Sequence, residues 1–517
     1  MDDLELKTTK ETIKLSLVIS PAEEKFDWWR KTLGFFIGPL LFALLYLWPM
    51  PTLSPEAHRL TAILGLVLTY WISEAIPIPV TALLGVVLCV VLGIAEARVA
   101  FAPFSDPIIF LFIGSFMLAE AMVVHRMDKR LALTILSWPW VGTSPVRILF
   151  ACGAITAFIS MWISNTATTA MMLPIILGIL RAMANLRSQE AGGEASSYAT
   201  GSMLFIAYAA SIGGIGTPIG TVPNLIGIGM IDRLLGIKIT FFTWMLLGLP
   251  LVIVMYLILF FLIKGLYPTQ STGMGGLREY LTAEKQALGG WSRGQMNVLI
   301  AFAIMISLWL LPGFIALFEG AEGPLYKLYS RILPEGVVAI IGVSFLFFLP
   351  TNWKQKEFTL SWPQASRIDW GTILLFGGGL SLGSMVFSTR LAEVMGQKII
   401  GLTGAQSLWS ITAVAALSAL ILTEFTSNTA AANMIIPVFV AVSKTAGVSG
   451  IPPALGACLA CSLGFMLPVS TPPNAIVYGT GLVPITRMIK TGIILDIFGL
   501  CAIVLMLRLL CPLLGLL

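Results

Sequence analysis

The stretch Met161–Pro174, MWISNTATTAMMLP, places a Ser-Asn-Thr tripeptide and further threonines in the middle of an apolar run. A second copy of the pattern stands at Glu424–Pro437, EFTSNTAAANMIIP, where Ser-Asn-Thr is again followed by small residues, a methionine and a proline. The two tripeptides begin at Ser164 and Ser427, 263 positions apart. A polar cluster that occurs twice in an apolar setting predicts a functional feature, and the surrounding sequence indicates which kind.

The composition is that of a chain embedded in a membrane. Of the 517 residues, 57% are hydrophobic and 11% are charged, and the mean hydropathy is +0.92. A soluble domain carries about 25% charged residues. The apolar runs are long enough to cross a bilayer core of about 30 Å as helices, and they lack the alternation of barrel strands. We therefore expect an all-α integral membrane protein whose partner is the lipid bilayer and not a nucleic acid.

Each Ser-Asn-Thr cluster interrupts a long apolar segment, the first at 148–181 and the second at 405–442. The arms on either side are too short to cross a membrane on their own. Arg147 and Arg181 flank the open ends of the first segment, and charged residues favour the interface, so both ends are expected on one side. The pattern predicts two re-entrant helical hairpins whose polar tips are covered by protein or by a watery cavity.

Two further apolar segments, 200–232 and 454–482, are interrupted by proline-containing stretches. These stretches read TPIGTVPN at 217–224 and LPVSTPPN at 467–474. The prolines remove helical hydrogen-bond donors and break the helix. Each segment is therefore predicted to be a crossing helix with an unwound middle.

The interruptions recur at nearly constant spacing, which indicates an internal duplication. The hairpins are 263 positions apart, and the asparagines that end the two proline-containing stretches are 250 apart. FIGS (112–115) and FGGG (376–379) are 264 apart, and ALLGV (82–86) and AIIGV (339–343) are 257 apart. A unit of five crossings and one hairpin has an odd number of crossings. The second copy must therefore insert in the opposite orientation, as in many secondary transporters. The predicted division is a cytosolic N-terminal tail (1–32), a first repeat with one preceding helix (33–265), a connecting cytosolic loop (266–295) and a second, inverted repeat (296–517).

The basic residues favour a topology of eleven transmembrane helices. With the N-terminus inside and the hairpins not counted as crossings, 21 of the 31 Lys and Arg residues fall on the inner side, which agrees with the positive-inside rule. The N-terminus is then cytoplasmic and the C-terminus external, in the plasma (inner) membrane. The segments 126–146 and 389–404 mix charged and apolar residues and are predicted to lie in the interface. They are either the arms on which a mobile domain swings or ordinary loop helices.

The interruptions would bring four helix starts together, after Ser164, Pro223, Ser427 and Pro473. Helix N-termini offer free N–H groups and about half a positive charge each, so they suit a carboxylate or a sulfate. The unwound turns also free carbonyl oxygens, which together with hydroxyl and amide oxygens favour a hard cation. Because the clusters contain no carboxylate, Na⁺ is favoured over Ca²⁺. The alternative is that the serines and asparagines only cap helices.

Another hydroxyl precedes each cluster by one helical turn, at Ser160 and at Thr423. Residues i and i+4 share a helix face, so Ser160 is expected to stack with Ser164, and Thr423 with Ser427. Each hairpin would then present two oxygens in the same direction. Glu424 is adjacent to Thr423 and has two interpretations: it adds charge or a proton to a cation site, or it faces away.

Together these features resemble the divalent anion/sodium symporter family. The resemblance rests on the two Ser-Asn-Thr motifs in a duplicated membrane chain, on CSLGFMLPVSTPPNAIV (461–477) and on WISEAIPIPVTALL (71–84). It covers about residues 30–515. It implies a homodimer in which a scaffold supports a mobile transport domain that works by an elevator motion.

The resemblance also implies roles for residues at the matching positions, with Na⁺ as the coupling ion. The implied substrate contacts are Asn165, Thr166, Thr221, Asn428, Thr429 and Thr471. The implied ligands of one Na⁺ are Ser160, Ser164, Asn165 and the backbone of Gly220, and those of a second are Thr423, Asn428 and the backbone of Ser470.

The sequence therefore predicts a secondary active transporter that couples Na⁺ to the movement of a small divalent anion. A C4 dicarboxylate such as succinate, malate or fumarate is the expected substrate. A sodium-independent dicarboxylate exchanger and a sulfate transporter of the same architecture are the alternatives. An intramembrane enzyme is disfavoured, because a zinc protease needs an HExxH motif and the two histidines, His58 and His125, do not form one.

Overall fold

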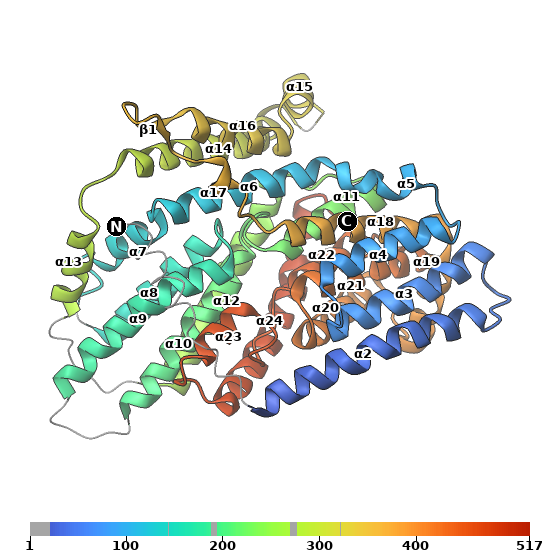
Figure 1. Cartoon of the computed structure of the whole chain (residues 1–517), viewed down its shortest axis with the longest axis horizontal. Coiled ribbons are helices and arrows are strands. Elements are labelled where there is room, and N and C mark those ends of the chain that lie inside the picture. The colour runs from blue at the N-terminus through green and yellow to red at the C-terminus, as the bar shows by residue number, and fades with distance from the viewer. Residues whose placement is uncertain (1–20, 143, 188–193, 269–276, 321) are drawn as a thin grey trace.

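The computed structural model describes residues 21–142, 144–187, 194–268, 277–320 and 322–517, which are almost entirely helical (Figure 1). Residues 1–20 of the predicted tail lie outside the described part, and the first described helix already begins at Pro21. The helices up to residue 266 are α2 (Pro21–Leu47), α3 (Pro55–Ser73), α4 (Ile78–Val91), α5 (Ala97–Phe101), η1 (Ala102–Ser105), α6 (Pro107–Val124), α7 (Met127–Leu136), α8 (Pro145–Ser160), α9 (Asn165–Arg187), α10 (Glu194–Gly214), α11 (Val222–Leu235) and α12 (Phe241–Leu266). The later elements are α13 (Leu277–Ala287), α14 (Arg293–Glu319), α15 (Pro324–Ile332), α16 (Glu335–Phe348), β1 (Pro350–Asn352), β2 (Glu357–Phe358), α17 (Trp362–Ala365), α18 (Trp370–Ser388), α19 (Leu391–Thr403), α20 (Leu408–Phe425), α21 (Asn428–Thr445), α22 (Ile451–Ala460), α23 (Pro472–Tyr478) and α24 (Ile485–Leu513).

Seven helical spans in the described residues are long and apolar enough to cross a membrane. The pair α15 and α16, bent by 54°, raises the number to eight if it forms one span. The predicted total of eleven leaves out the hairpin arm Leu408–Phe425. It adds α3, α4, α16 and the two broken helices, which taken singly fall short of this measure of length and hydropathy, so it stays a prediction. The seven spans are Lys25–Leu47, Ala97–Val124, Phe241–Leu266, Arg293–Glu319, Trp370–Ser388, Leu408–Phe425 and Ile485–Leu513.

Both predicted interruptions at Ser-Asn-Thr are present as breaks between two helices. In the first hairpin, α8 ends at Ser160 and α9 begins at Asn165. In the second, α20 ends at Phe425 and α21 begins at Asn428. The arms pack against each other in both hairpins, so each Ser-Asn-Thr cluster forms the tip of a helical pair.

The two proline-containing stretches likewise separate helices, as predicted. The chain unwinds between α10 and α11, and again between α22 and α23. The second arm of each hairpin packs against the broken helix of the other half: α9 contacts α23, and α21 contacts α11. The polar tips of the hairpins and the unwound turns are therefore drawn to a common place.

Helix contacts between the two halves follow the spacing found in the sequence. Helix α6 packs against α16, and the corresponding pair of the other half, α18 and α4, packs in the same way. A Cβ atom added to Gly114 would lie 2.6 Å from Cβ of Ala339, and one added to Gly378 would lie 2.7 Å from Cβ of Ala82. Gly114 and Gly378 belong to one predicted repeat pair and the two alanines to the other, so both halves use the same close glycine–alanine contact.

Several elements differ from the all-α prediction or were absent from it. Strands β1 and β2 form a two-stranded antiparallel ribbon, and α15 is an additional helix. The predicted connecting loop contains α13. Helix α7 covers only the first part of the predicted interfacial segment 126–146, and a turn containing Pro139 follows it. Helix α19 agrees with the other predicted segment, 389–404.

The two hairpins lie on different sides of the molecule. In Figure 1, α2, α3 and α4 lie on the same side as α18 to α22, whereas α8, α9 and α10 lie toward the opposite side with α13. Contacts of α4 with α18 and of α9 with α13 agree with this view. The larger apolar core joins both hairpins and both broken helices, and a smaller one joins α3, α4 and α18.

Candidate functional site

The tips of both hairpins and both unwound turns line a single cavity of about 790 Å³. Phe112, Phe116 and Ile163 contribute apolar walls. All six residues predicted to contact substrate line this cavity, and so do five of the seven predicted cation ligands. These residues are Ser164, Asn165, Thr166, Gly220, Thr221, Asn428, Thr429, Ser470 and Thr471.

The remaining two predicted cation ligands, Ser160 and Thr423, are fully buried behind the hairpin tips. Ser160 Oγ donates to Asn165 Oδ1 at 2.7 Å, and Thr423 Oγ1 donates to Asn428 Oδ1 at the same distance. Thr423 Oγ1 also lies 2.9 Å from the carbonyl oxygen of Cys461, where the second broken helix unwinds. Each hairpin therefore holds a hydroxyl oxygen and an amide oxygen side by side behind its tip, and the pair is the same in both halves.

The serine that begins each Ser-Asn-Thr tripeptide caps the helix that forms the second arm of its hairpin. Ser164 Oγ accepts a hydrogen bond from the backbone N–H of Ala167 at 3.3 Å, and Ser427 Oγ accepts one from that of Ala430 at 3.2 Å. The expected stacking of these serines on the hydroxyls one turn earlier is wrong. The i, i+4 relation needs a continuous helix, and α8 and α20 both end before the tripeptide begins.

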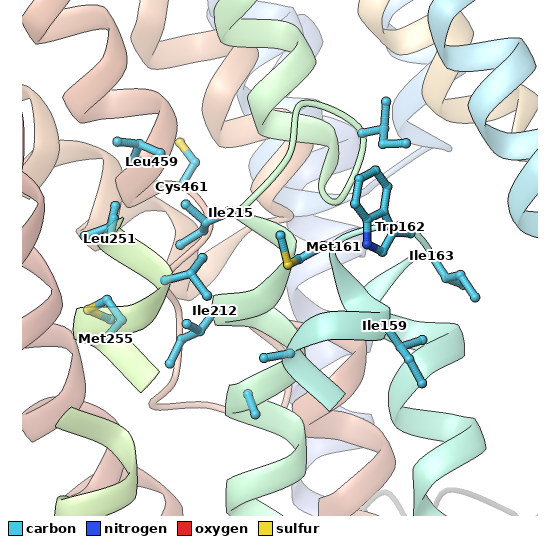
Figure 2. Packing of buried hydrophobic residues seen from close by; sticks show 14 of the residues in the cluster. Ile159, Met161, Trp162, Ile163, Ile212, Ile215, Leu251, Met255, Leu459 and Cys461 are labelled. Carbon is cyan, nitrogen blue, oxygen red and sulfur yellow. The ribbon is translucent and has the colours of Figure 1, made fainter. Parts of the chain in front are cut away.

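Figure 2 shows how the tip of the first hairpin is anchored in apolar packing. Met161 lies toward Ile212 and Ile215 near the end of α10, whereas Trp162 and Ile163 lie farther from them, and all five belong to one buried cluster. A Cβ atom added to Gly216 in the first unwound turn would lie 2.8 Å from Cε of Met161. The polar tip is thus held by close packing of its apolar neighbours against the first unwound turn.

An asparagine side chain holds each unwound turn in place. Asn224 and Asn474 each donate their Nδ2 hydrogens to the backbone carbonyls ten and seven residues upstream. The four bonds run from Asn224 to Gly214 (2.9 Å) and Thr217 (2.7 Å), and from Asn474 to Gly464 (3.0 Å) and Leu467 (3.0 Å). Both side chains are fully buried, and the Oδ1 atom of each has no hydrogen-bond partner among the described residues. Neither asparagine was predicted to have a role, although the matching Pro-Asn at the end of both stretches was an available signal.

The helices after the two turns start in the same way. Thr221 precedes α11 and Thr471 precedes α23, and both are extended, with φ of −144° and −142°. Thr471 Oγ1 accepts from the N–H of Asn474, whereas the Thr221 side chain caps no N–H of its helix. Prolines, which lack an N–H, stand in the first turn of both helices, and at α23 the N–H of Asn474 is taken by Thr471. These two starts therefore contribute to the cavity wall mainly through the positive ends of their helix dipoles.

Charged side chains also line the cavity, and their gathering there was not predicted from the sequence. Arg30 forms ion pairs with Asp27 at 2.7 Å and with Glu74 at 3.3 Å. Arg367 is exposed and makes no ion pair within the described residues. These residues are far apart in sequence, so only the fold brings them together. The charged lining residues are Asp27, Arg30, Lys31, Glu74, Glu120, Arg367 and Asp369.

Glu424 faces the second unwound turn and is fully buried. Its carboxylate accepts hydrogen bonds from the N–H of Met466 and from the hydroxyl of Ser470. Of the two interpretations that the sequence left open, the structure therefore favours the one that places this side chain beside the predicted second cation site.

A polar cavity at the meeting point of two hairpin tips and two broken helices, inside a bundle of apolar helices, defines a membrane transport protein. The chain belongs to the family described as the sodium:sulfate symporter transmembrane region, whose profile matches residues 27–517. This confirms the resemblance to divalent anion/sodium symporters.

Relatives in the family are similar over nearly their whole length. The sodium-dependent dicarboxylate transporter SdcS of Staphylococcus saprophyticus is 34% identical over 483 residues, which cover 93% of this chain and 91% of the relative. SdcS of Staphylococcus aureus strain NCTC 8325 is 33% identical over 479 residues, covering 92% and 90%. An uncharacterized transporter of Haemophilus influenzae is 33% identical over 468 residues, covering 90% and 93%.

A solved structure shows the same fold at low sequence identity. The YdaH transporter of Alcanivorax borkumensis, whose crystal structure is described as revealing an unusual topology, aligns with a TM-score of 0.52. The alignment covers 93% of this chain and 96% of that one, at 11% identity. This likeness concerns the fold alone.

Proposed function

We propose that this chain is a secondary active transporter that couples Na⁺ to the movement of a small dicarboxylate across the plasma membrane. A C4 dicarboxylate such as succinate, malate or fumarate is the substrate we favour. The observation that carries the proposal is the single cavity into which both Ser-Asn-Thr tips and both unwound turns converge. The names of the SdcS relatives, sodium-dependent dicarboxylate transporters, support the substrate class and the coupling ion.

The substrate would lie between the two tips. Asn165 and Thr166 face it from one hairpin, and Asn428 and Thr429 from the other. The threonines at the two broken helices complete the set from the remaining sides. The six neutral donors and the helix N-termini suit two carboxylate groups, because they stabilise negative charge without a fixed counter-ion that would hold the substrate too tightly to release.

Two Na⁺ ions would bind behind the substrate, one in each half. The oxygen pair of Ser160 and Asn165, with Ser164 and the backbone of Gly220, would hold the first. The corresponding pair of Thr423 and Asn428, with the backbone of Ser470, would hold the second. A dianion that leaves water for a low-dielectric site needs compensating charge. The cations supply it, and their movement down a gradient would drive uptake.

The close glycine–alanine contacts in both halves support two inverted repeats. We propose eleven transmembrane helices, a cytoplasmic N-terminus and an external C-terminus. The hairpins and broken helices would form the mobile domain of an elevator mechanism, within a homodimer. The interfacial helices α7 and α19 precede the hairpins and are the arms of this motion in the proposal.

Uptake of labelled succinate into proteoliposomes that contain the purified chain tests the proposal. We expect uptake with external Na⁺, little uptake when K⁺ replaces it, and competition by malate and fumarate. Equal uptake in K⁺ that requires dicarboxylate inside the vesicle would instead establish a sodium-independent exchanger.

A sulfate transporter is the second candidate, because the family description itself names sulfate. Sulfate is compact, whereas a C4 dicarboxylate separates its two charges and matches two hairpin tips that face each other. Unlabelled sulfate is therefore expected to inhibit succinate uptake far less than fumarate does. Stronger inhibition by sulfate than by fumarate would favour the second candidate.

A further inference from the structure

The carboxylate of Glu424 connects the second hairpin to the unwound turn between α22 and α23. Its Oε1 accepts from the backbone N–H of Met466 at 3.2 Å, and its Oε2 accepts from Ser470 Oγ at 2.6 Å. Ser470 Oγ also lies 3.0 Å from the carbonyl oxygen of Glu424. Both oxygens of this buried carboxylate are thus used to hold the segment that carries a predicted cation ligand.

Helix α24 supports the same turn from another direction through Asp496. Asp496 is 4% exposed, and its Oδ1 accepts from the N–H of Gly464 at 3.4 Å. Its Oδ2 has no hydrogen-bond partner among the described residues. The hydroxyl of Tyr208 donates to the carbonyl of Phe465 at 2.8 Å. The turn is therefore fixed at several consecutive residues by groups from three helices.

The first half has no counterpart of this carboxylate. The spacing of 263 that relates the hairpins places Met161 where the second half has Glu424, and the spacing of 250 that relates the broken helices places Gly220 where it has Ser470. Met161 packs its side chain against Gly216, so the first turn is held by apolar packing and by uncharged hydrogen bonds such as those of Asn224. The two halves thus share the same hydroxyl–amide oxygen pair but differ in the charge behind it.

We propose that Glu424 is a positioning residue that makes the two cation sites unequal, so that the second site binds Na⁺ more tightly than the first. This inference rests on the proposed function. Glu424 acts through Ser470 and Met466: it fixes the turn whose carbonyl oxygen at Ser470 would ligate the cation. It also adds a negative charge beside that site, and charge interactions are strong in a buried environment. The first site has neutral ligands only.

Asp496 holds the same turn from α24 through Oδ1, which accepts from the N–H of Gly464. An asparagine at this position still accepts from Gly464 through Oδ1. Asp496→Asn is therefore expected to behave like the unmodified chain, whereas Asp496→Leu removes the acceptor.

The test is the Na⁺ concentration that gives half-maximal succinate uptake in proteoliposomes. Glu424→Gln preserves the size of the side chain and removes its charge, and hydrogen bonds to charged groups have large effects. We expect the half-maximal Na⁺ concentration to rise about tenfold, with the succinate KM at saturating Na⁺ and the maximal rate unchanged. A purely structural defect would lower the maximal rate instead. Met161→Leu is the matched control in the first half and is expected to leave all three values unchanged.

Two further variants complete the test. Asp496→Leu is expected to raise the half-maximal Na⁺ concentration, and Asp496→Asn to leave it within about twofold of the unmodified value. If Glu424→Gln yields no folded protein, Ser470→Ala takes its place. It removes only the hydroxyl that Glu424 holds and is expected to raise the same concentration at least about threefold.

Specific results would overturn the inference. One is an unchanged half-maximal Na⁺ concentration in Glu424→Gln, or in Ser470→Ala where that variant replaces it. Another is a rise of this concentration in Met161→Leu as large as the rise in Glu424→Gln. A changed Na⁺ dependence in Asp496→Asn would overturn the role given to Asp496. Failure of the proposed function is distinguishable, because uptake by the unmodified chain would then not depend on Na⁺ at all.

Discussion

Replacement of the asparagines in the unwound turns tests whether these turns, and not only the hairpin tips, build the site. Asn224→Leu and Asn474→Leu preserve roughly the side-chain size and remove both amide donors. Each variant leaves one buried carbonyl group without a donor, that of Gly214 or that of Gly464. The carbonyls of Thr217 and Leu467 still accept from the backbone N–H of Gly220 and Ser470. An unsatisfied buried polar group costs about 1–3 kcal/mol, so each change should cost about that much in the native geometry.

The turn can lower this cost only by moving its carbonyls toward water in the cavity, and that movement displaces Thr221 or Thr471. Succinate uptake in proteoliposomes is therefore expected to fall at least about tenfold in each variant, since 1.4 kcal/mol corresponds to a factor of ten. Thermal unfolding in detergent, measured as the loss of the monodisperse peak, is expected to occur at a lower temperature than in the unmodified chain.

A matched control is Asn297→Leu at the start of α14. Asn297 also donates two hydrogen bonds, to the Pro350 carbonyl at 3.2 Å and to Thr359 Oγ1 at 2.8 Å, but it does not line the cavity. We expect this variant to lose stability and to preserve the Na⁺ dependence and the succinate KM. Normal uptake by Asn224→Leu and Asn474→Leu, or an equal loss of uptake in the control, would refute the reasoning.

Three other predictions concern the tips, the oxygen pairs and an interfacial carboxylate. Thr166→Val and Thr429→Val preserve shape and remove a hydroxyl from the cavity, so uptake should fall steeply while expression persists; unchanged kinetics in both would mean that the tips serve only as caps. Ser160→Ala and Thr423→Val each remove one oxygen of a pair and should raise the half-maximal Na⁺ concentration about tenfold, which Na⁺ titration of uptake measures. Burial raises the pKa of Asp128 from 3.8 to about 6, so its ionised form destabilises the fold by about 3 kcal/mol above pH 6 and less as the pH falls toward 4. Asp128→Asn should therefore raise the unfolding temperature at pH 7.5 and have little effect at pH 4, and an equal effect at both would contradict this assignment.

The sequence predicted the features that interrupt its apolar pattern. The Ser-Asn-Thr tips and the two proline-containing turns appear where they were expected, because polar clusters and prolines in apolar helices have few structural interpretations. The repeat spacing matched Gly114 with Gly378 and Ala82 with Ala339. In the structure each of these glycines contacts one of these alanines.

What the sequence could not predict depends on the tertiary structure. The contact of Asp496 with the turn near Gly464 joins residues 32 positions apart on different elements, and no local pattern encodes it. The expected stacking of Ser160 on Ser164 assumed a continuous helix, and the break falls between them. Helix α15 has nine residues and the strands of the β1–β2 ribbon have three and two, so these elements are too short to stand out beside the long apolar runs.

The central claim is that one cavity binds the anion and the cations together, so that the Na⁺ gradient drives the anion. The most direct test uses proteoliposomes loaded with K⁺ medium that contains labelled succinate at the same concentration as the medium outside. An inward Na⁺ gradient is then imposed, with no other gradient. The account predicts that internal succinate rises above the external concentration and falls back when a Na⁺ ionophore collapses the gradient. An internal concentration that never exceeds the external one would contradict it.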